Sequence, residues 1–414
     1  MNREQSIIKL RELVARRRLV EARNLSLSLA HAYPQDATIW RMRGDLHLQL
    51  DEFDSAIECT QRIIMLLLPN ASLNRATLNE LYRTLGTTYY KASRVPEAIN
   101  AFDRFISAEP NNADVHAFRA ICRLLLGDFQ RGWPEYEWRL KTQFVSVPPE
   151  PRWDGGSLEN KVILIESEQG HGDTIQFVRY VRDIKAQGGT VILRCQPSLH
   201  SLLAGCAGVD QIVNQGDLAP PYDVGITLLS LPGIFRTSLA TIPAEIPYLQ
   251  VPQGAGARAV TLIAGHEKVL RVGLVWAGTT NRSLTLSQFS ELLAIKGIKF
   301  FSLQKGDAAA EFKSIVPDTI IDLSSYLGDF ADTAAVIQAL DLVISVDTAV
   351  AHLAGALGRP VWTLLPFAPD WRWMLDREDS PWYPTMRLFR QPAPRDWSSV
   401  VKRVSVQLKA LGVS

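Results

Sequence analysis

Two turns in the sequence have residue types and spacings that could support chemistry. The first follows an apolar run and reads Gly170-His171-Gly172-Asp173-Thr174. Glycines permit a tight turn, and Asp173 stands where a helix would begin. It is therefore either a helix cap or a general base that takes a proton from a hydroxyl. Spacing alone favours the cap.

This first turn does not suit a pyrophosphate. The dinucleotide fingerprint G-x-G-x-x-G requires glycine at position 175, where isoleucine stands, and no G-x-x-x-x-G-K-[ST] occurs in the chain. A carboxylate at the helix start also repels the phosphate that the helix dipole would attract. The turn is better suited to a hydroxyl.

The second turn, Asp347-Thr348-Ala349, suits a phosphate. It follows the apolar run 342–346. The small Ala349 leaves the helix start open, so backbone N–H groups and the Thr348 hydroxyl can meet a phosphate oxygen, and Asp347 can accept from a sugar hydroxyl. His352 lies one turn further on the same face, and is either a phosphate contact or a structural histidine.

Polar residues also follow the other predicted strands of this half. Gln304 and Lys305 end one strand, and Lys305 is either a cation for a leaving diphosphate or a solvated lysine. Arg282 and Ser283 follow another strand, and Pro366 opens an aromatic loop that stacks on a base or is purely structural. No D-x-D and no close histidine–cysteine spacing occurs, so we expect no metal.

Parallel sheets must position these turns. From about residue 146, short apolar runs alternate with helical stretches, which is typical of βαβ units. We predict two Rossmann-like domains, residues 146–255 and 256–414, whose strand ends face one cleft. Residues 252–269 have the composition of a linker.

Residues 1–145 carry a helical repeat instead. Two units of tetratricopeptide spacing are visible, with extra residues between them: Trp40, Gly44, Ala56 and Pro69, then Tyr82, Gly86, Ala98, Phe102 and Pro110. The fold class expected is α-helical tetratricopeptide repeats followed by α/β. The small residues let paired helices approach closely, and the stack either binds a protein or peptide in its groove or serves as a scaffold.

The composition of the chain indicates which broad classes of protein it can belong to. The 414 residues are 47% apolar and 21% charged, as in a folded chain. The net charge of +1 gives no reason to expect nucleic-acid binding. There is no transmembrane run of about 18 residues and no export signal, and the four cysteines form no C-x-x-C. We expect a cytoplasmic protein with reduced thiols.

The segments ESEQGHGDTIQFVRY, RVGLVWAG, FFSLQKGD and above all residues 329–390 resemble bacterial tetratricopeptide-repeat proteins with a heptosyltransferase-like domain of glycosyltransferase family 9. The resemblance implies a GT-B fold and an inverting transfer that needs no metal or other cofactor, with the nucleotide-sugar as co-substrate. It implies that Asp173 is the base and that Lys305 faces the phosphates. The other expected substrate-binding residues are Gly170, His171, Gly172, Thr174, Arg282, Ser283, Gln304, Asp347, Thr348, Ala349, His352 and Pro366.

The function expected from both arguments is an inverting, metal-independent glycosyltransferase that moves a sugar from a nucleotide-sugar to an acceptor hydroxyl. The repeats would recruit a protein or peptide, with the acceptor as one candidate. The alternative is a non-catalytic adaptor, whose repeats recruit a protein while a degenerate transferase domain acts as scaffold. Retention of Asp173, Lys305, Asp347, Thr348 and His352 together argues against that alternative.

Overall fold

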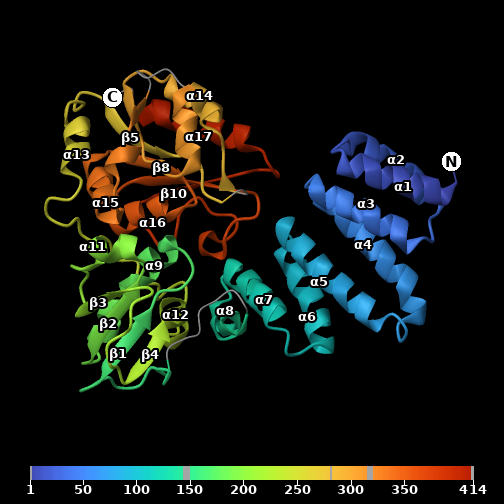
Figure 1. Cartoon of the computed structure of the whole chain (residues 1–414), viewed down its shortest axis with the longest axis horizontal. Coiled ribbons are helices and arrows are strands. Elements are labelled where there is room, and N and C mark those ends of the chain that lie inside the picture. Colours follow the sequence, from blue (N-terminus) through green and yellow to red (C-terminus); the bar gives the residue numbers. More distant parts are fainter. Residues whose placement is uncertain (1, 143–149, 280–281, 315–319, 412–414) are drawn as a thin grey trace. The chain divides into compact units, whose positions relative to one another are not determined.

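The computed structural model describes residues 2–142, 150–279, 282–314 and 320–411. It divides into two compact units, Met1–Thr142 and Gln143–Ser414 (Figure 1). The predicted domain boundary at residues 145–146 lies outside the described residues. Helices fill the first unit and parallel sheets form the second, so the predicted order of a helical repeat followed by an α/β region is confirmed.

The first unit is a series of antiparallel helix pairs. The first helix of each pair ends in a residue with left-handed backbone, namely Arg17, Asp51, Ser93 or Gly127. In each case the next residue donates its N–H to a carbonyl five positions back, as Glu52 does to His47 at 2.9 Å, which is a Schellman-type end. The helices are α1 Arg3–Ala15, α2 Leu19–Ala32, α3 Ala37–Gln49, α4 Phe53–Leu67, α5 Arg75–Lys91, α6 Val95–Ala108, α7 Ala113–Leu125 and α8 Phe129–Tyr136.

The spacing of these left-handed residues along the sequence gives the length of each repeat. Successive ends lie 34 residues apart from 17 to 51, 42 residues apart from 51 to 93, and 34 residues apart from 93 to 127. The extra residues therefore lie in α4, in α5 or in the connection between them. Glycine lets the paired helices meet, as predicted: a Cβ on Gly44 would lie 3.3 Å from Cys59 Cβ, and one on Gly86 only 2.4 Å from Phe102 Cε1.

A buried carboxylate on α8 joins the two helices of the last pair. Glu135 of α8 is 7% exposed. It accepts from Arg119 Nε at 2.9 Å, from Arg123 Nη1 at 2.7 Å, and contacts His116 Nδ1 at 2.7 Å, all three on α7. Charge-assisted bonds of this kind satisfy a carboxylate that has lost its water.

The second unit contains two parallel sheets. The first has the order β3-β2-β1-β4, and the second has the order β7-β6-β5-β8-β9-β10. Their central strands are mostly apolar and buried, as expected for strands covered on both faces. The strands are β1 Val162–Glu166, β2 Thr190–Cys195, β3 Gln211–Asn214, β4 Val224–Thr227, β5 Leu270–Val275, β6 Ile298–Ser302, β7 Ile320–Asp322, β8 Leu342–Val346, β9 Val361–Leu365 and β10 Met386–Arg390.

The second sheet has the strand order of a classic doubly wound fold, in which the direction of winding reverses between β5 and β8. Val275 pairs with Ser345 in this sheet, so the segments that follow both strands leave at one edge. In the first sheet the corresponding reversal lies between β1 and β4. Helix α9 (His171–Phe177) follows β1, α16 (Ala349–Ala356) follows β8, and Figure 1 shows the two helices between the sheets.

Three elements differ from the sequence prediction. Residues 257–264, in the predicted linker, form α13 Ala257–Ala264, whose cap Gly256 donates its N–H to Asp332 Oδ1 of α15 at 2.8 Å. Strand β10 and helix α17 (Trp397–Leu411), which covers the second sheet, were not predicted. The remaining helices are α10 Val181–Lys185, α11 His200–Leu203, α12 Leu231–Ile234, α14 Ser290–Leu293 and α15 Phe330–Ala339. Among the described residues, no helix is long and apolar enough to span a bilayer.

Candidate active site

One cavity of about 470 Å³ is lined by both of the turns that the sequence singled out. It lies at the carboxyl ends of β1, β5 and β8, where each sheet reverses its winding and where ligands of such folds bind. Its walls are Gln169, Gly170, His171, Gly172 and Asp173 from the first sheet, and Gly278, Thr279, Arg282, Asp347, Thr348, Ala349, His352, Asp370 and Arg372 from the second.

Asp173 both caps its helix and faces this cavity. Its Oδ2 accepts the N–H of Gly170, the residue before α9, at 2.8 Å. Its Oδ1 forms an ion pair with Arg372 Nη2, and 17% of the side chain is exposed. Burial raises the pKa of Asp173 above the usual aspartate value, and the positive charge of Arg372 opposes the rise.

Arg372 is the main residue of the site that sequence reasoning missed. It follows β9 in the loop Asp370-Trp371-Arg372-Trp373. Besides Asp173, its guanidinium contacts Asp370 Oδ1 at 2.9 Å and donates to Gln176 Oε1 of α9 at 2.6 Å. The sequence signal for Arg372 was an arginine between two tryptophans shortly after a strand. Its partner Asp173 lies 199 residues away, so spacing could not pair the two.

Asp347 and Arg282 form an ion pair on the opposite wall. Asp347 Oδ2 lies 2.9 Å from Arg282 Nη1. Burial raises the pKa of Asp347 to about 6, although the charge of Arg282 acts to lower it. The cavity thus has an arginine–carboxylate pair on each side, Arg372 with Asp173 and Arg282 with Asp347, which keeps buried charges compensated.

His352 is neutral at physiological pH. Burial, assisted by the nearby charge of Arg372, lowers its pKa to about 3. Its Nδ1 is 2.9 Å from the hydroxyl of Tyr383, and its ring stacks on Trp373 with centroids 5.1 Å apart. Its Nε2 lies 3.9 Å from Asp347 Oδ1, too far for a hydrogen bond. His352 therefore offers the cavity a neutral imidazole edge.

The start of α16 lies very close to α9. Thr348 is the N-cap of α16, and its hydroxyl bonds Ser345 Oγ at 2.9 Å rather than capping the helix. The first N–H groups of the helix have no partner within the helix. A Cβ on Gly172 would lie 2.8 Å from His352 Cδ2 and 3.5 Å from the Cα of Ala349, so this approach requires glycine.

Gln304 and Lys305 line an adjoining cavity of about 300 Å³, which shares His171, Thr348 and Ala349 with the first. Gln304 Oε1 accepts the N–H groups of Trp276 and Ala277 at 3.1 and 2.9 Å, so it shapes the loop after β5. The Lys305 ammonium donates to the carbonyl of Leu327. Lys305 is therefore beside the cavity of Asp173 and Asp347 rather than in its wall.

His171 lies between the two cavities. Its Nε2 is 2.9 Å from Ser198 Oγ and its ring stacks on Phe330 at 5.1 Å. Burial lowers its pKa.

The other predicted positions lie outside both walls. Thr174 is buried and donates to Gln196 Oε1 at 2.9 Å, and Ser283 Oγ accepts the N–H of Gly278 at 3.0 Å. Pro366 is buried after β9.

The two parallel sheets define the second unit as an α/β region of the doubly wound type, with a cavity at the strand ends. Residues 292–373 match the model of glycosyltransferase family 9 (heptosyltransferase), and residues 9–64 and 83–136 match a tetratricopeptide-repeat model. The chain thus combines a segment similar to tetratricopeptide repeats with a segment similar to glycosyltransferase family 9. The family match includes the Asp347 turn and Arg372 but not the Asp173 turn.

Protein FlbA of Caulobacter vibrioides (strain ATCC 19089 / CIP 103742 / CB 15) is 29% identical to this chain over 336 residues. The match covers 72% of this chain and 55% of that protein, so the chain spans about half the length of this relative. The crystal structure of the family 9 glycosyl transferase from Veillonella parvula DSM 2008 aligns with a TM-score of 0.49 at 10% identity, over 63% of this chain and 99% of that one. The structure of E. coli ADP-heptose lps heptosyltransferase II aligns with a TM-score of 0.45 at 13% identity, and the alignment covers 61% of this chain and 98% of that one.

Proposed function

We propose that the second unit is a GT-B glycosyltransferase that moves a sugar, with inversion and without a metal or other cofactor, from a nucleotide-sugar to an acceptor hydroxyl. The observation that carries the proposal is the shared cavity. One wall presents a buried carboxylate, Asp173, and the other presents a helix start with an arginine beside it, Thr348 and Arg282. A base for one substrate and an anion site for the other thus face the same space of about 470 Å³.

In the proposed reaction Asp173 acts on the acceptor. The acceptor oxygen forms a bond to the anomeric carbon, the bond from that carbon to the diphosphate oxygen breaks, and the hydroxyl proton passes to Asp173. Burial raises the pKa of Asp173, which strengthens it as a base, while the charge of Arg372 favours the ionised form that can accept the proton.

The leaving diphosphate would be stabilised at the other wall. The N-terminus of α16 supplies backbone N–H groups and the positive end of the helix dipole, and Arg282 supplies a full charge. Lys305 is in the adjoining cavity that shares Thr348 and Ala349, so a donor occupying both cavities would meet it. Such preorganised charges act on the developing diphosphate, and Asp347 would accept from a sugar hydroxyl.

The repeats are proposed to recruit a protein or peptide, with the acceptor as the first candidate. Phe118 on α7 is 40% exposed and stacks on Phe102 at 6.2 Å. A photo-crosslinking residue at position 118 of the full chain should label a partner through the repeats. Labelling that is unchanged when the crosslinker is moved to the exposed Leu218, in the second unit, would count against recruitment by the repeats.

The catalytic proposal is tested first by ligand binding. Thermal unfolding of the full chain is measured with UDP, GDP, ADP, dTDP and CMP and with their sugar derivatives. A ligand at 100 times its Kd stabilises the folded state by about 2.7 kcal/mol. At least one nucleotide and its sugar conjugate should raise the unfolding temperature. If none does, the adaptor alternative is favoured.

The base is then tested with Asp173→Asn. With the donor that binds, release of nucleoside diphosphate should slow by about 10²–10⁴-fold while the thermal shift by the donor is kept. Asp223→Asn is the matched control, because Asp223 also accepts a backbone N–H, from Val162 at 2.7 Å at the opposite end of β1. Wild-type turnover by Asp173→Asn would refute the assignment of the base.

A further inference from the structure

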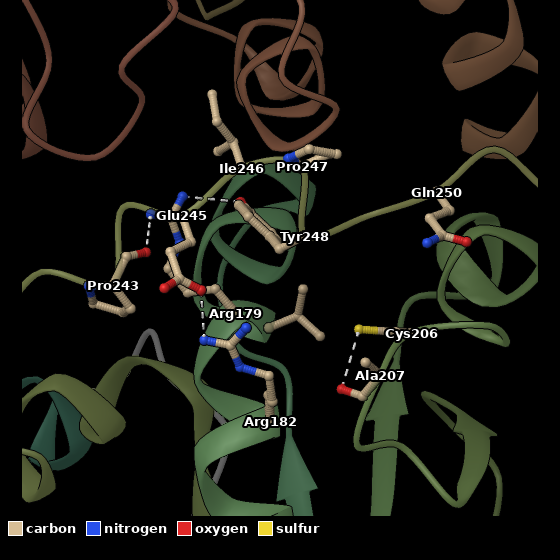
Figure 2. Close-up of a pocket in the computed structure, with 11 residues that line it drawn as sticks. Arg179, Arg182, Cys206, Ala207, Pro243, Glu245, Ile246, Pro247, Tyr248 and Gln250 are labelled. Atoms are coloured by element: carbon tan, nitrogen blue, oxygen red, sulfur yellow. Dashed lines mark hydrogen bonds and ion pairs between the residues drawn. The ribbon is translucent and has the colours of Figure 1, made fainter.

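Arg179 is a buried cation that joins separate parts of the second unit. It follows α9 in the chain and is 6% exposed. Its Nε donates to the carbonyl of Gln176 at 2.8 Å, and Nη1 donates to the carbonyls of Pro243 at 3.1 Å and Trp382 at 2.8 Å. Its Nη2 donates to the Tyr248 hydroxyl at 3.0 Å. Figure 2 shows the bonds to Pro243 and Tyr248.

The environment of Arg179 is unusual for a buried charge. Within the described residues, its hydrogen-bond acceptors are carbonyl and hydroxyl oxygens rather than carboxylates. Aromatic rings supply the remaining compensation, with its guanidinium carbon 4.5 Å from the ring centre of Tyr248 and 4.7 Å from that of Tyr383. A planar guanidinium held by several fixed acceptors has little freedom to move, so it imposes a geometry on the segments that it binds.

The segments held by Arg179 connect the two sheets. Pro243 and Tyr248 belong to the crossover from the first sheet to the second, and the N–H of Tyr248 donates to the carbonyl of Ala356 at the end of α16 at 3.0 Å. The Tyr248 hydroxyl donates to the carbonyl of Ile175 in α9 at 2.9 Å. Arg179 and Tyr248 together therefore tie α9 to α16.

The same contacts lead to the proposed base. Gln176, whose carbonyl binds Arg179, accepts from Arg372 Nε through its side-chain oxygen, and Arg372 forms the ion pair with Asp173. On the other branch, Trp382 precedes Tyr383, whose hydroxyl is bonded to His352. A change at Arg179 can thus alter both walls of the cavity although Arg179 lines neither.

We propose that Arg179 is a positioning residue of the transfer site: it fixes α9, the crossover and the loop at Trp382 so that Asp173 and the α16 turn keep their relative places. The inference rests on the proposed function for its catalytic consequence. It adds a residue to which neither the sequence patterns nor the family resemblance assigned a role.

A second cavity makes the proposal testable by substitution. About 410 Å³ of space adjoins Arg179, Arg182, Tyr248 and Cys206 (Figure 2), so water can enter beside a shorter side chain. Arg179→Met removes all the donors while keeping an unbranched side chain, and Arg179→Lys keeps the charge. Arg182→Met is the matched control, because Arg182 lines the same cavity one turn away and its side chain pairs with the exposed Glu245 at 3.0 Å.

Catalysis should respond in kcat rather than in donor binding. With the donor that stabilises the wild type, we expect Arg179→Met to keep donor affinity within about threefold and to lower kcat about 10- to 100-fold, because small misplacement of reacting groups is costly. Arg179→Lys should recover part of the loss, and Arg182→Met should equal the wild type. Equal kcat for folded Arg179→Met and wild type would overturn the proposal, as would equal losses for both methionine variants.

A second measurement does not depend on activity. The N–H groups of Tyr248 and Leu249 both donate to the Ala356 carbonyl, at 3.0 and 3.3 Å, so hydrogen exchange in this peptide reports the crossover. Exchange should accelerate at least tenfold in Arg179→Met and remain unchanged in Arg182→Met. Unchanged exchange in both would refute the positioning role. If exchange accelerates but the wild type transfers no sugar, the proposed function fails while the positioning of the crossover stands.

Discussion

Gly172→Ala tests the close approach of α9 and α16 on which the shared cavity depends. Gly172 is helical and has no left-handed backbone, so alanine adds no backbone strain. The added Cβ would lie 2.8 Å from His352 Cδ2, at least about 0.7 Å closer than the 3.5 Å at which carbon atoms pack well. The His352 ring cannot turn away easily, because Tyr383 binds its Nδ1 and Trp373 covers its face.

The expected costs differ for stability and for catalysis. Overpacking costs about 1–3 kcal/mol, and replacing glycine by alanine within a helix returns about 1 kcal/mol. Gly172→Ala should therefore lower the free energy of unfolding by at most about 2 kcal/mol. Relief of the clash moves α9, and with it Asp173, by a few tenths of an ångström or more away from the α16 turn. Turnover should fall about 10- to 100-fold.

The assay compares nucleoside diphosphate release with thermal unfolding. Gly265→Ala is the control, since a Cβ there meets nothing within 4 Å. A double-mutant cycle adds His352→Asn, whose shorter side chain should relieve the clash and give a coupling in stability of about 1 kcal/mol. Wild-type turnover by Gly172→Ala together with no coupling to position 352 would refute the reasoning.

Two further predictions concern buried titratable groups. Glu135→Gln leaves Arg119 and Arg123 without their buried carboxylate and should destabilise the repeats by about 3 kcal/mol in urea melts followed by circular dichroism; an equal effect of Glu80→Gln, an exposed pair, would contradict this. The pKa of His352 falls from 6.5 to about 3 on folding, so its stabilising contribution is complete above pH 6.5 and is lost as the pH falls toward 3. Between pH 6.5 and pH 5 the wild type should lose about 1.6 kcal/mol relative to His352→Asn. Because its pKa is raised to about 6, Asp347 stabilises the folded state as the pH falls below 6, but this contribution is present in both proteins. The exposed His31→Asn serves as the control.

The sequence predicted those helices and strands whose formation depends on residues near them in the chain. The glycines and alanines that let helices pair in the repeats, the buried strands, and the starts of α9 and α16 all depend on neighbouring residues, and they lie close to where spacing placed them. Strand β10 (Met386–Arg390) escaped prediction because Arg387 and Arg390 interrupt its apolar residues, so it lacks a continuous apolar run. Helix α13 escaped because glycines flank it, although Gly256 serves as its left-handed cap.

The site was less predictable because its chemistry depends on contacts between distant segments. Spacing placed Asp173 and Asp347 at strand ends, but not the arginine that each one pairs with. Lys305 looked suitable as a phosphate cation because it ends a strand. The structure instead brings Arg282 into the wall, because the loop after β5 folds over the α16 turn and Gln304 holds that loop. The fold thus decides which cation faces which carboxylate.

The structure also changes the choice between cap and base for Asp173, because the two roles use different oxygens. Oδ2 holds the Gly170 N–H, and Oδ1 faces Arg372. In Asp173→Asn the side-chain carbonyl can still accept from Gly170, so the cap survives while the basicity is lost. Asp173→Ala removes both, and should cost a further 0.5–2 kcal/mol or so of stability. Equal turnover but unequal unfolding temperatures of the two variants would separate the cap from the proposed catalytic role. If Asp173→Asn turned over like the wild type and only Asp173→Ala were impaired, Asp173 would be a cap alone.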